Sequence, residues 1–150
     1  MATTEQWSAN LVDDDAGLTR IFREARTIAV LGAKAQPSAP AHYVPAYLAR
    51  AGFRVLPVNP TLVGGQILGE TVLPTLADLA EPVDVIEVFR RPEYLPAHAA
   101  EILKLPWRPA VVWFQLGIRN DAAAEPLARA GIRVVQDRCM MPEHRRLLAR

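Results

Sequence analysis

The stretch of sequence that decides the fold runs from residue 27 to residue 60 and reads TIAVLGAKAQPSAPAHYVPAYLARAGFRVLPVNP. Its first five residues are an apolar run that ends at Gly32, which is typical of a strand covered on both faces. A polar loop follows over 33–40, then a helical pattern over 42–51, then a second apolar strand over 53–58. Strand, helix and strand in this order predict a βαβ unit, which joins two parallel strands of one sheet.

The rest of the chain continues this alternation of strands and helices. Further strands are expected over 84–89, 110–114 and 132–135, with a short one over 66–68. Further helices are expected over 18–25, 74–79, 92–104, 120–130 and 142–149. The pattern predicts an α/β fold, a Rossmann-like, doubly wound and mostly parallel sheet of five to six strands with helices on both faces. A length of 150 residues corresponds to one domain, 1–150, in which we expect 1–12 to be a flexible N-terminus.

Composition narrows the classes of partner and the compartment. The formal net charge is +1, so no global field draws the chain to nucleic acid or to a membrane. Cys139 is the single cysteine, which rules out an internal disulfide and favours a reducing, cytoplasmic compartment. The N-terminus lacks the basic and apolar regions of a secretory signal, and no apolar run approaches the roughly 20 residues that span a bilayer.

Two features of the βαβ unit separate it from a dehydrogenase. The loop after Gly32 lacks the second and third glycines of the G-x-G-x-x-G motif, and Asn59 stands where the acidic residue that binds a NAD ribose would be. These differences indicate a phosphate-bearing nucleotide other than NAD. An NADP-dependent oxidoreductase or another nucleotide-binding enzyme stays open as an alternative, because Arg54 or Arg91 could meet a 2′-phosphate.

Ligands of such sheets bind at the carboxyl ends of the strands, where the candidate motifs of this chain also fall. Gly32 leads into a helix whose N-terminal N–H groups can receive a phosphate, with Lys34 as an added charge, or it only permits a tight exit from the strand. Asn59, held extended by Pro60, offers an amide to a nucleotide or forms a stiff surface turn.

The later strand ends carry aromatic, basic and polar groups. Phe89 offers a ring, and of Arg90 and Arg91 we expect one to point into the crevice and bind phosphate. Gln115 and Gly117 reach the crevice after the next strand. Cys139 and His144 have the spacing of a thiol–imidazole pair, but a free cysteine is more often a small buried apolar group. We therefore predict no catalytic residue and no metal site.

Six stretches together resemble the CoA-binding domain family, which includes small stand-alone bacterial proteins and the N-terminal domain of the succinyl-CoA synthetase alpha subunit. They read IAVLGA (28–33), GFRVLPVNP (52–60), ILGE (67–70), VDVIEVFR (83–90), VWFQLGI (112–118) and AGIRVVQDRC (130–139). The resemblance implies that the chain binds coenzyme A. The family's contacts fall on Gly32, Ala33 and Lys34 for the phosphates, and on Val58, Asn59, Pro60, Phe89 and Arg90 for the nucleotide and pantetheine.

The function that we expect is binding of CoA or an acyl-CoA, with the diphosphate over the N-terminus of helix 42–51. The full set of expected binding residues is Gly32, Ala33, Lys34, Val58, Asn59, Pro60, Phe89, Arg90, Arg91, Gln115 and Gly117. A chain of this length has no room for the grasp domains of a synthetase, so we expect a binding or regulatory module without chemistry of its own. Binding to a protein partner or to a second copy stays open. Relatives often carry Ser at the position of Lys34, so we expect the affinity to be modest.

Overall fold

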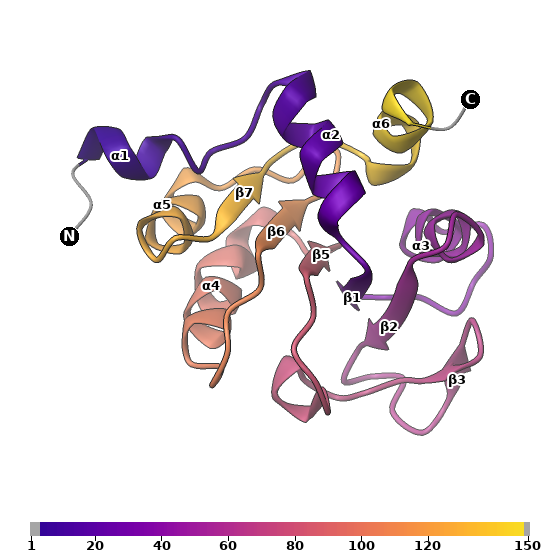
Figure 1. Cartoon of the computed structure of the whole chain (residues 1–150). Coiled ribbons are helices and arrows are strands. Elements are labelled where there is room, and N and C mark those ends of the chain that lie inside the picture. Colours follow the sequence, from indigo (N-terminus) through magenta and orange to yellow (C-terminus); the bar gives the residue numbers. More distant parts are fainter. Residues whose placement is uncertain (1–3, 149–150) are drawn as a thin grey trace.

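The computed structural model describes residues 4–148, which form one parallel sheet between two layers of helices (Figure 1). The strand order is β2-β1-β5-β6-β7, with every neighbouring pair parallel. The strands are β1 Thr27–Leu31, β2 Arg54–Val58, β5 Val85–Val88, β6 Val111–Phe114 and β7 Arg133–Val135. The predicted Rossmann-like α/β fold is confirmed, and the sheet has five strands.

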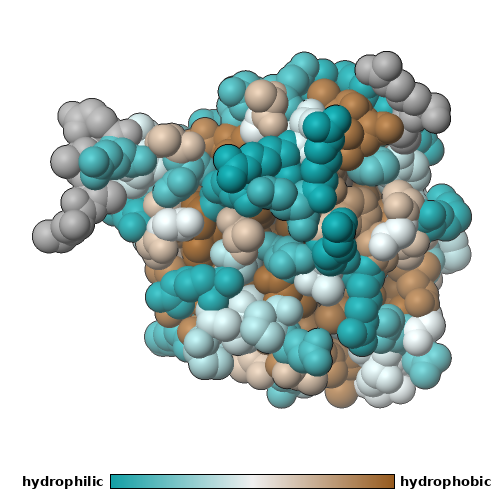
Figure 2. All heavy atoms as spheres, viewed as in Figure 1, coloured by the Kyte–Doolittle hydropathy of each residue, from teal (hydrophilic) through white to brown (hydrophobic). Residues whose placement is uncertain are grey.

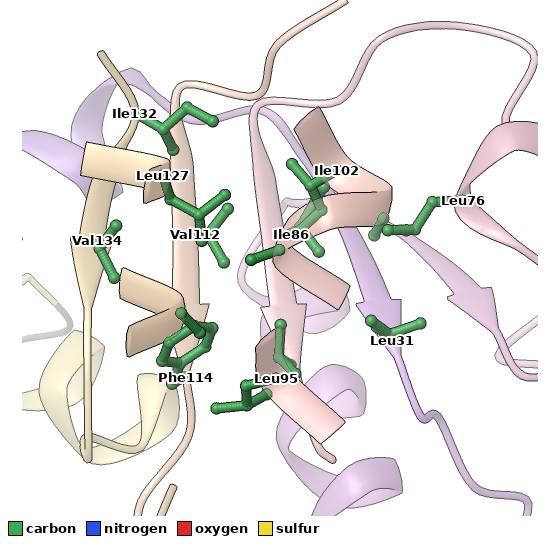
Figure 3. Close-up of a cluster of buried hydrophobic side chains, with 14 of the residues drawn as sticks. Leu31, Leu76, Ile86, Leu95, Ile102, Val112, Phe114, Leu127, Ile132 and Val134 are labelled. Carbon is green, nitrogen blue, oxygen red and sulfur yellow. The ribbon is translucent and has the colours of Figure 1, made fainter. Parts of the chain in front are cut away.

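Helices cover both faces of the sheet because alternate residues of the strands point to opposite sides. One face packs against α2 Asp15–Glu24, α3 Pro40–Arg50 and α6 Met140–Leu147, through residues such as Val30 and Trp113. The other packs against α4 Leu95–Leu103 and α5 Asp121–Arg129. Figure 3 shows this second core, where Ile86 and Val112 of the sheet meet Ile102 and Leu127 of the helices. The strands are thus buried on both sides, as their continuous apolar runs predict.

The helix boundaries follow their capping residues. Asp14 caps α2 by accepting from the Gly17 N–H at 2.9 Å, and Asn120 caps α5, as expected, by accepting from the Ala123 N–H at 3.0 Å. Helix α3 differs from the prediction. It begins at Pro40, a favoured first position, and not at residue 42, so that Pro45 lies in the helix interior.

The segment between β2 and β5 also differs from the prediction. Residues 66–68 do not join the main sheet, because β3 Gln66–Ile67 pairs with β4 Glu70–Thr71 in a separate antiparallel hairpin. Leu68 and Gly69 both have positive φ in its two-residue turn. The helix expected over 74–79 is a single 3₁₀ turn, η1 Leu76–Asp78. The helix expected over 92–104 begins with another such turn, η2 Pro92–Tyr94, and continues directly as α4.

The structure describes the N-terminal segment from residue 4 onward, within the stretch 1–12 that we expected to be flexible. Helix α1, Thr4–Ser8, lies beside α5 (Figure 1), and Trp7 is half-buried against the core, with the Arg129 guanidinium 4.8 Å from its ring centroid. The chain then runs along β7, where Val12 donates to the Val134 carbonyl at 2.9 Å. Residues 1–3 lie outside the described residues.

The surface mixes polar and apolar residues. On the face shown in Figure 2, mostly hydrophilic residues lie over α2, and hydrophobic residues show beside them. Within the described residues, no helix combines the length and apolar character needed to cross a membrane. Among the side chains that the structure describes, Leu116 is the most exposed of the large apolar ones, with 68% of its surface exposed.

Candidate functional site

The crevice of this fold lies between the carboxyl ends of β1 and β5. These two strands are neighbours, but the chain after β1 leads to α3 on one face, whereas the chain after β5 leads to α4 on the other. The order β2-β1-β5 therefore has its topological switch point here, which is where doubly wound sheets hold their ligands. A cleft of about 460 Å³ opens at this point, within the size range of small-molecule sites.

Five of the predicted residues line this cleft, namely Lys34, Phe89, Arg90, Arg91 and Gln115. The sequence-based prediction missed the other lining residues, which are Ala39, Pro40, Ala41, Tyr43, Pro92, Leu116, Ile118 and Cys139. Pro92, Leu116 and Ile118 follow β5 or β6 within a few residues, and Cys139 follows β7, so the topological rule for strand ends could have found these four. The remaining predicted residues lie outside the lining.

Gly32 has a steric role in the floor of the site. Its φ is +94°, and a Cβ atom at this position would strike the carbonyl oxygen of Phe89. Any side chain would thus push β1 and β5 apart where their loops diverge. Gly32 thus permits a tight exit from the strand, and its part in binding a phosphate stays a prediction.

The loop after Gly32 is fixed by hydrogen bonds from three directions. The Asn59 side chain donates to the Ala33 carbonyl at 2.8 Å, and the Lys34 N–H donates to the Ala41 carbonyl at 3.3 Å. The His42 Nδ1 atom lies 2.8 Å from the Lys34 carbonyl. These hydrogen bonds hold the loop in one conformation. Asn59 contributes to the site by holding this loop, and it is not among the residues that line the cleft.

The same contacts reduce the helix-terminal donors that we expected for a phosphate. Pro40 has no N–H, and the His42 and Tyr43 N–H groups both bond to the Ala39 carbonyl, at 2.8 and 2.9 Å. In the first turn of α3, as the described residues show it, the Ala41 N–H is the one donor without a hydrogen-bond partner. The helix terminus therefore offers an anion few free donors, whereas Lys34, Arg90 and Arg91 line the cleft.

Three further predicted residues do not fit a direct side-chain role. Val58 is completely buried in the core, and Pro60 is exposed. Gly117 has a φ of +82° in the turn after β6, and its N–H donates to Asp137 Oδ1 at 2.6 Å. The structure thus places these three residues in the core, at the surface and in a turn, and their part in ligand binding stays a prediction.

The cleft carries an excess of positive charge. Lys34, Arg90 and Arg91 line it, and in the described part of the chain no acidic side chain forms an ion pair with any of them. Arg54, by contrast, lies at the opposite end of its strand and pairs with Glu70 at 3.5 Å. It is therefore not available to a ligand in the cleft.

Cys139 also lines the cleft, as do the apolar residues Leu116 and Ile118. Gln115 Nε2 lies 3.5 Å from its sulfur, while Gln115 Oε1 accepts from the Met140 N–H at 3.2 Å. Burial raises the pKa of the Cys139 thiol, although hydrogen bonds from Met141 and Gln115 oppose this rise. The group is thus a thiol at neutral pH.

His144 does not activate this thiol. Its Nδ1 atom lies 2.8 Å from the Tyr47 hydroxyl, and its ring packs edge-on against Phe22 and Phe53. Burial lowers the pKa of His144. In the part of the chain that the structure describes, no three His, Cys, Asp or Glu side chains are grouped to hold a metal ion.

Glu87 is a buried carboxyl that the sequence-based prediction did not single out. It lies on β5 between Val30 of β1 and Trp113 of β6, is completely buried, and neither of its oxygens has a hydrogen-bond partner. Burial raises the pKa of Glu87 to about 8. Its position in a strand covered on both faces is the signal that could have identified it.

Fold and site together define a Rossmann-like α/β domain with a basic, partly apolar cleft at its switch point. The chain belongs to the CoA binding domain family, whose model matches residues 26–145. This finding confirms the resemblance seen in the sequence.

Three relatives extend the comparison. The uncharacterized protein YneT of Bacillus subtilis (strain 168) is 33% identical over 129 residues, which cover 86% of this chain and 93% of that protein. Cell-free ID.343 from Thermus thermophilus is 51% identical, with a TM-score of 0.86 over 91% of this chain and all of that chain. A hypothetical protein from Pyrococcus horikoshii OT3 is 32% identical, with a TM-score of 0.83 over 91% of this chain and 93% of that chain.

Proposed function

We propose that this protein binds coenzyme A, or an acyl-CoA, in the cleft at the switch point and acts as a binding module without chemistry of its own. The observation that carries the proposal is the pairing of two kinds of surface in one cleft. Lys34, Arg90 and Arg91 supply positive charge without acidic partners, and Phe89, Leu116 and other apolar groups line the remainder. Coenzyme A has the same two parts, a phosphorylated nucleotide and a long, largely apolar pantetheine arm.

The lining of the cleft suggests an orientation for the ligand. The diphosphate would lie near Lys34 and Arg90, beside the first turn of α3, because these basic side chains line the cleft together with Pro40 and Ala41. The pantetheine arm would run toward Leu116 and Cys139. Membership of the CoA binding domain family supports the class of ligand, and the cleft supports its place.

Calorimetric titration of the purified protein tests the proposal. We expect CoA to bind with micromolar affinity, which corresponds to about 8 kcal/mol, and pantetheine without phosphates to bind much more weakly. NAD and NADP serve as controls. No heat with CoA at millimolar concentration would overturn the proposal, and tighter binding of NADP would favour the oxidoreductase instead.

Alkylation of Cys139 locates the ligand independently. It is the only cysteine of the chain, so any iodoacetamide adduct reports on the cleft. We expect saturating acetyl-CoA, which has no free thiol to consume iodoacetamide, to slow the reaction at least several-fold. An unchanged rate with acetyl-CoA bound would place the ligand elsewhere.

A further inference from the structure

Arg90 is held in the cleft before any ligand arrives. Its guanidinium lies 4.8 Å from the centroid of the Tyr94 ring, a cation–π distance. Its Nε atom donates to His98 Nε2 at 3.3 Å. The aliphatic part of the side chain passes directly over Gly32, where there is no Cβ to obstruct it.

His98 is in turn oriented by Glu101, one turn further along α4. The His98 Nδ1 atom lies 3.1 Å from Glu101 Oε1. A carboxylate can only accept, so the proton of the neutral imidazole is on Nδ1, and Nε2 is left as the acceptor that Arg90 requires. Both side chains are only partly exposed, at 20% for His98 and 31% for Glu101, which limits their alternatives.

This chain of contacts occupies one side of the guanidinium and leaves the other side available. Arg90 uses Nε for His98, while its two terminal nitrogens have no carboxylate partner among residues 4–148. The terminal nitrogens carry the paired N–H groups that bind phosphate in a forked geometry. A guanidinium that is already ordered loses less conformational entropy when it binds.

Arg91 provides the contrast. It lines the same cleft with the same charge, but it is exposed, and in the described part of the chain no side chain or ring holds its guanidinium. The difference between two adjacent arginines is therefore one of order and not of charge.

We propose that Glu101 and His98 are positioning residues that set Arg90 to receive a phosphate group of the ligand. This inference rests on the proposed binding of CoA. According to this inference, Arg90 selects phosphorylated ligands. Helix α4 takes part in that selection through His98 and Glu101, although it does not line the cleft.

Calorimetry with CoA on single and double variants tests the inference. Arg90→Gln should weaken CoA binding about 10- to 100-fold, as expected for loss of a charge-assisted hydrogen bond. His98→Ala and Glu101→Gln should each weaken it about 3- to 10-fold, because Arg90 becomes disordered. In the Arg90→Gln background, neither change should have a further effect, because both act through Arg90.

Matched variants exclude a general structural effect. His98→Gln keeps an acceptor for Arg90 and should restore most of the affinity that His98→Ala loses. Arg91→Gln removes an equal charge and should cost less than Arg90→Gln. The unfolding midpoint of each variant shows whether it is folded.

The outcomes separate this inference from the proposed function. Failure of the unaltered protein to bind CoA overturns both. Normal CoA binding with unchanged affinity in His98→Ala and Glu101→Gln overturns only the positioning role. Losses in these variants that simply add to that of Arg90→Gln also overturn it, since independent sites add.

Discussion

At the scale of single residues, Glu87 combines a charged group with an environment that favours its neutral form. Burial raises the pKa from an ordinary value of 4.5 to about 8. The folded state therefore holds a proton that the unfolded chain has already released between these two pH values. Stability from this residue is fully present below pH 4.5 and is lost as pH rises toward 8.

The first prediction concerns stability against pH. Between pH 5 and 8.5, the free energy of unfolding should fall because of Glu87, by at most about 5 kcal/mol for a shift of this size. Glu87→Gln cannot titrate, so its stability relative to the unaltered protein should increase with pH. Urea denaturation at several pH values measures this difference. Glu125→Gln, on an exposed ion pair of α5, is the control and should show no such trend.

The residues of the site could be predicted from the sequence where the strand order fixes their position, but not where the packing of loops does. Phe89, Arg90 and Gln115 follow strands directly, so the topology brings them to the cleft. Asn59 has the same kind of position, but its amide is engaged by the Ala33 carbonyl and by Thr61. Such engagement depends on the path of two loops, which sequence spacing does not fix.

At the scale of elements, a proline inside α3 affects the loop that lines the site. Pro45 lies in the helix interior and lacks the N–H that would bond to the Ala41 carbonyl four residues earlier. That carbonyl instead accepts from the Lys34 N–H at 3.3 Å. The proline thus leaves a helix acceptor free to fix the loop of the cleft.

The second prediction follows from this exchange of partners. Pro45→Ala supplies an N–H that competes for the Ala41 carbonyl, so the Lys34 amide should exchange its hydrogen faster, measured by NMR. CoA affinity should fall about 3- to 10-fold, because the loop must be ordered on binding. Pro126→Ala is a matched control, since Pro126 is the sixth residue of α5 as Pro45 is of α3. Equal effects of both variants would contradict the coupling.

Elements with strong periodicity were predictable, and the exceptions have local causes. Each of the five strands of the sheet was expected from its apolar run, and Asn120 was the expected cap of α5. The β3–β4 hairpin was not foreseen, because its turn places Leu68 at a φ of +54°, where a leucine is rarely found. The start of α3 was missed because Ala39 provides no side-chain cap.

At the scale of the whole molecule, the N-terminal segment covers one edge of the sheet, along β7. Val134 of β7 donates to the Asn10 carbonyl at 2.8 Å, and Asn10 Nδ2 donates to the Ala128 carbonyl at 2.9 Å. Together with the packing of Trp7 on the core, these contacts tie the segment to β7 and α5. Its apolar signal is too short for sequence patterns to reveal this docking.

The third prediction concerns removal of this segment. A chain that begins at Asp13 should be less stable by about 2–5 kcal/mol, from the lost backbone bonds and apolar burial. Urea denaturation measures the loss, and light scattering should show more self-association, because the margin of β7 becomes open. Trp7→Phe is the control. It keeps the aromatic packing and removes a buried indole N–H that has no partner, so it should remain close to the unaltered stability. A truncated chain of full stability would contradict the prediction.

The opposite edge of the sheet, formed by β2, is also covered by irregular chain. Leu73 donates to the Pro57 carbonyl at 3.0 Å and accepts from the Asn59 N–H at 2.9 Å, so irregular chain lies along β2 as it does along β7. The sheet thus meets solvent with its backbone groups on both outer strands already partly satisfied. Another polypeptide would find little template for strand addition here and would have to recognise helices and loops through their side chains.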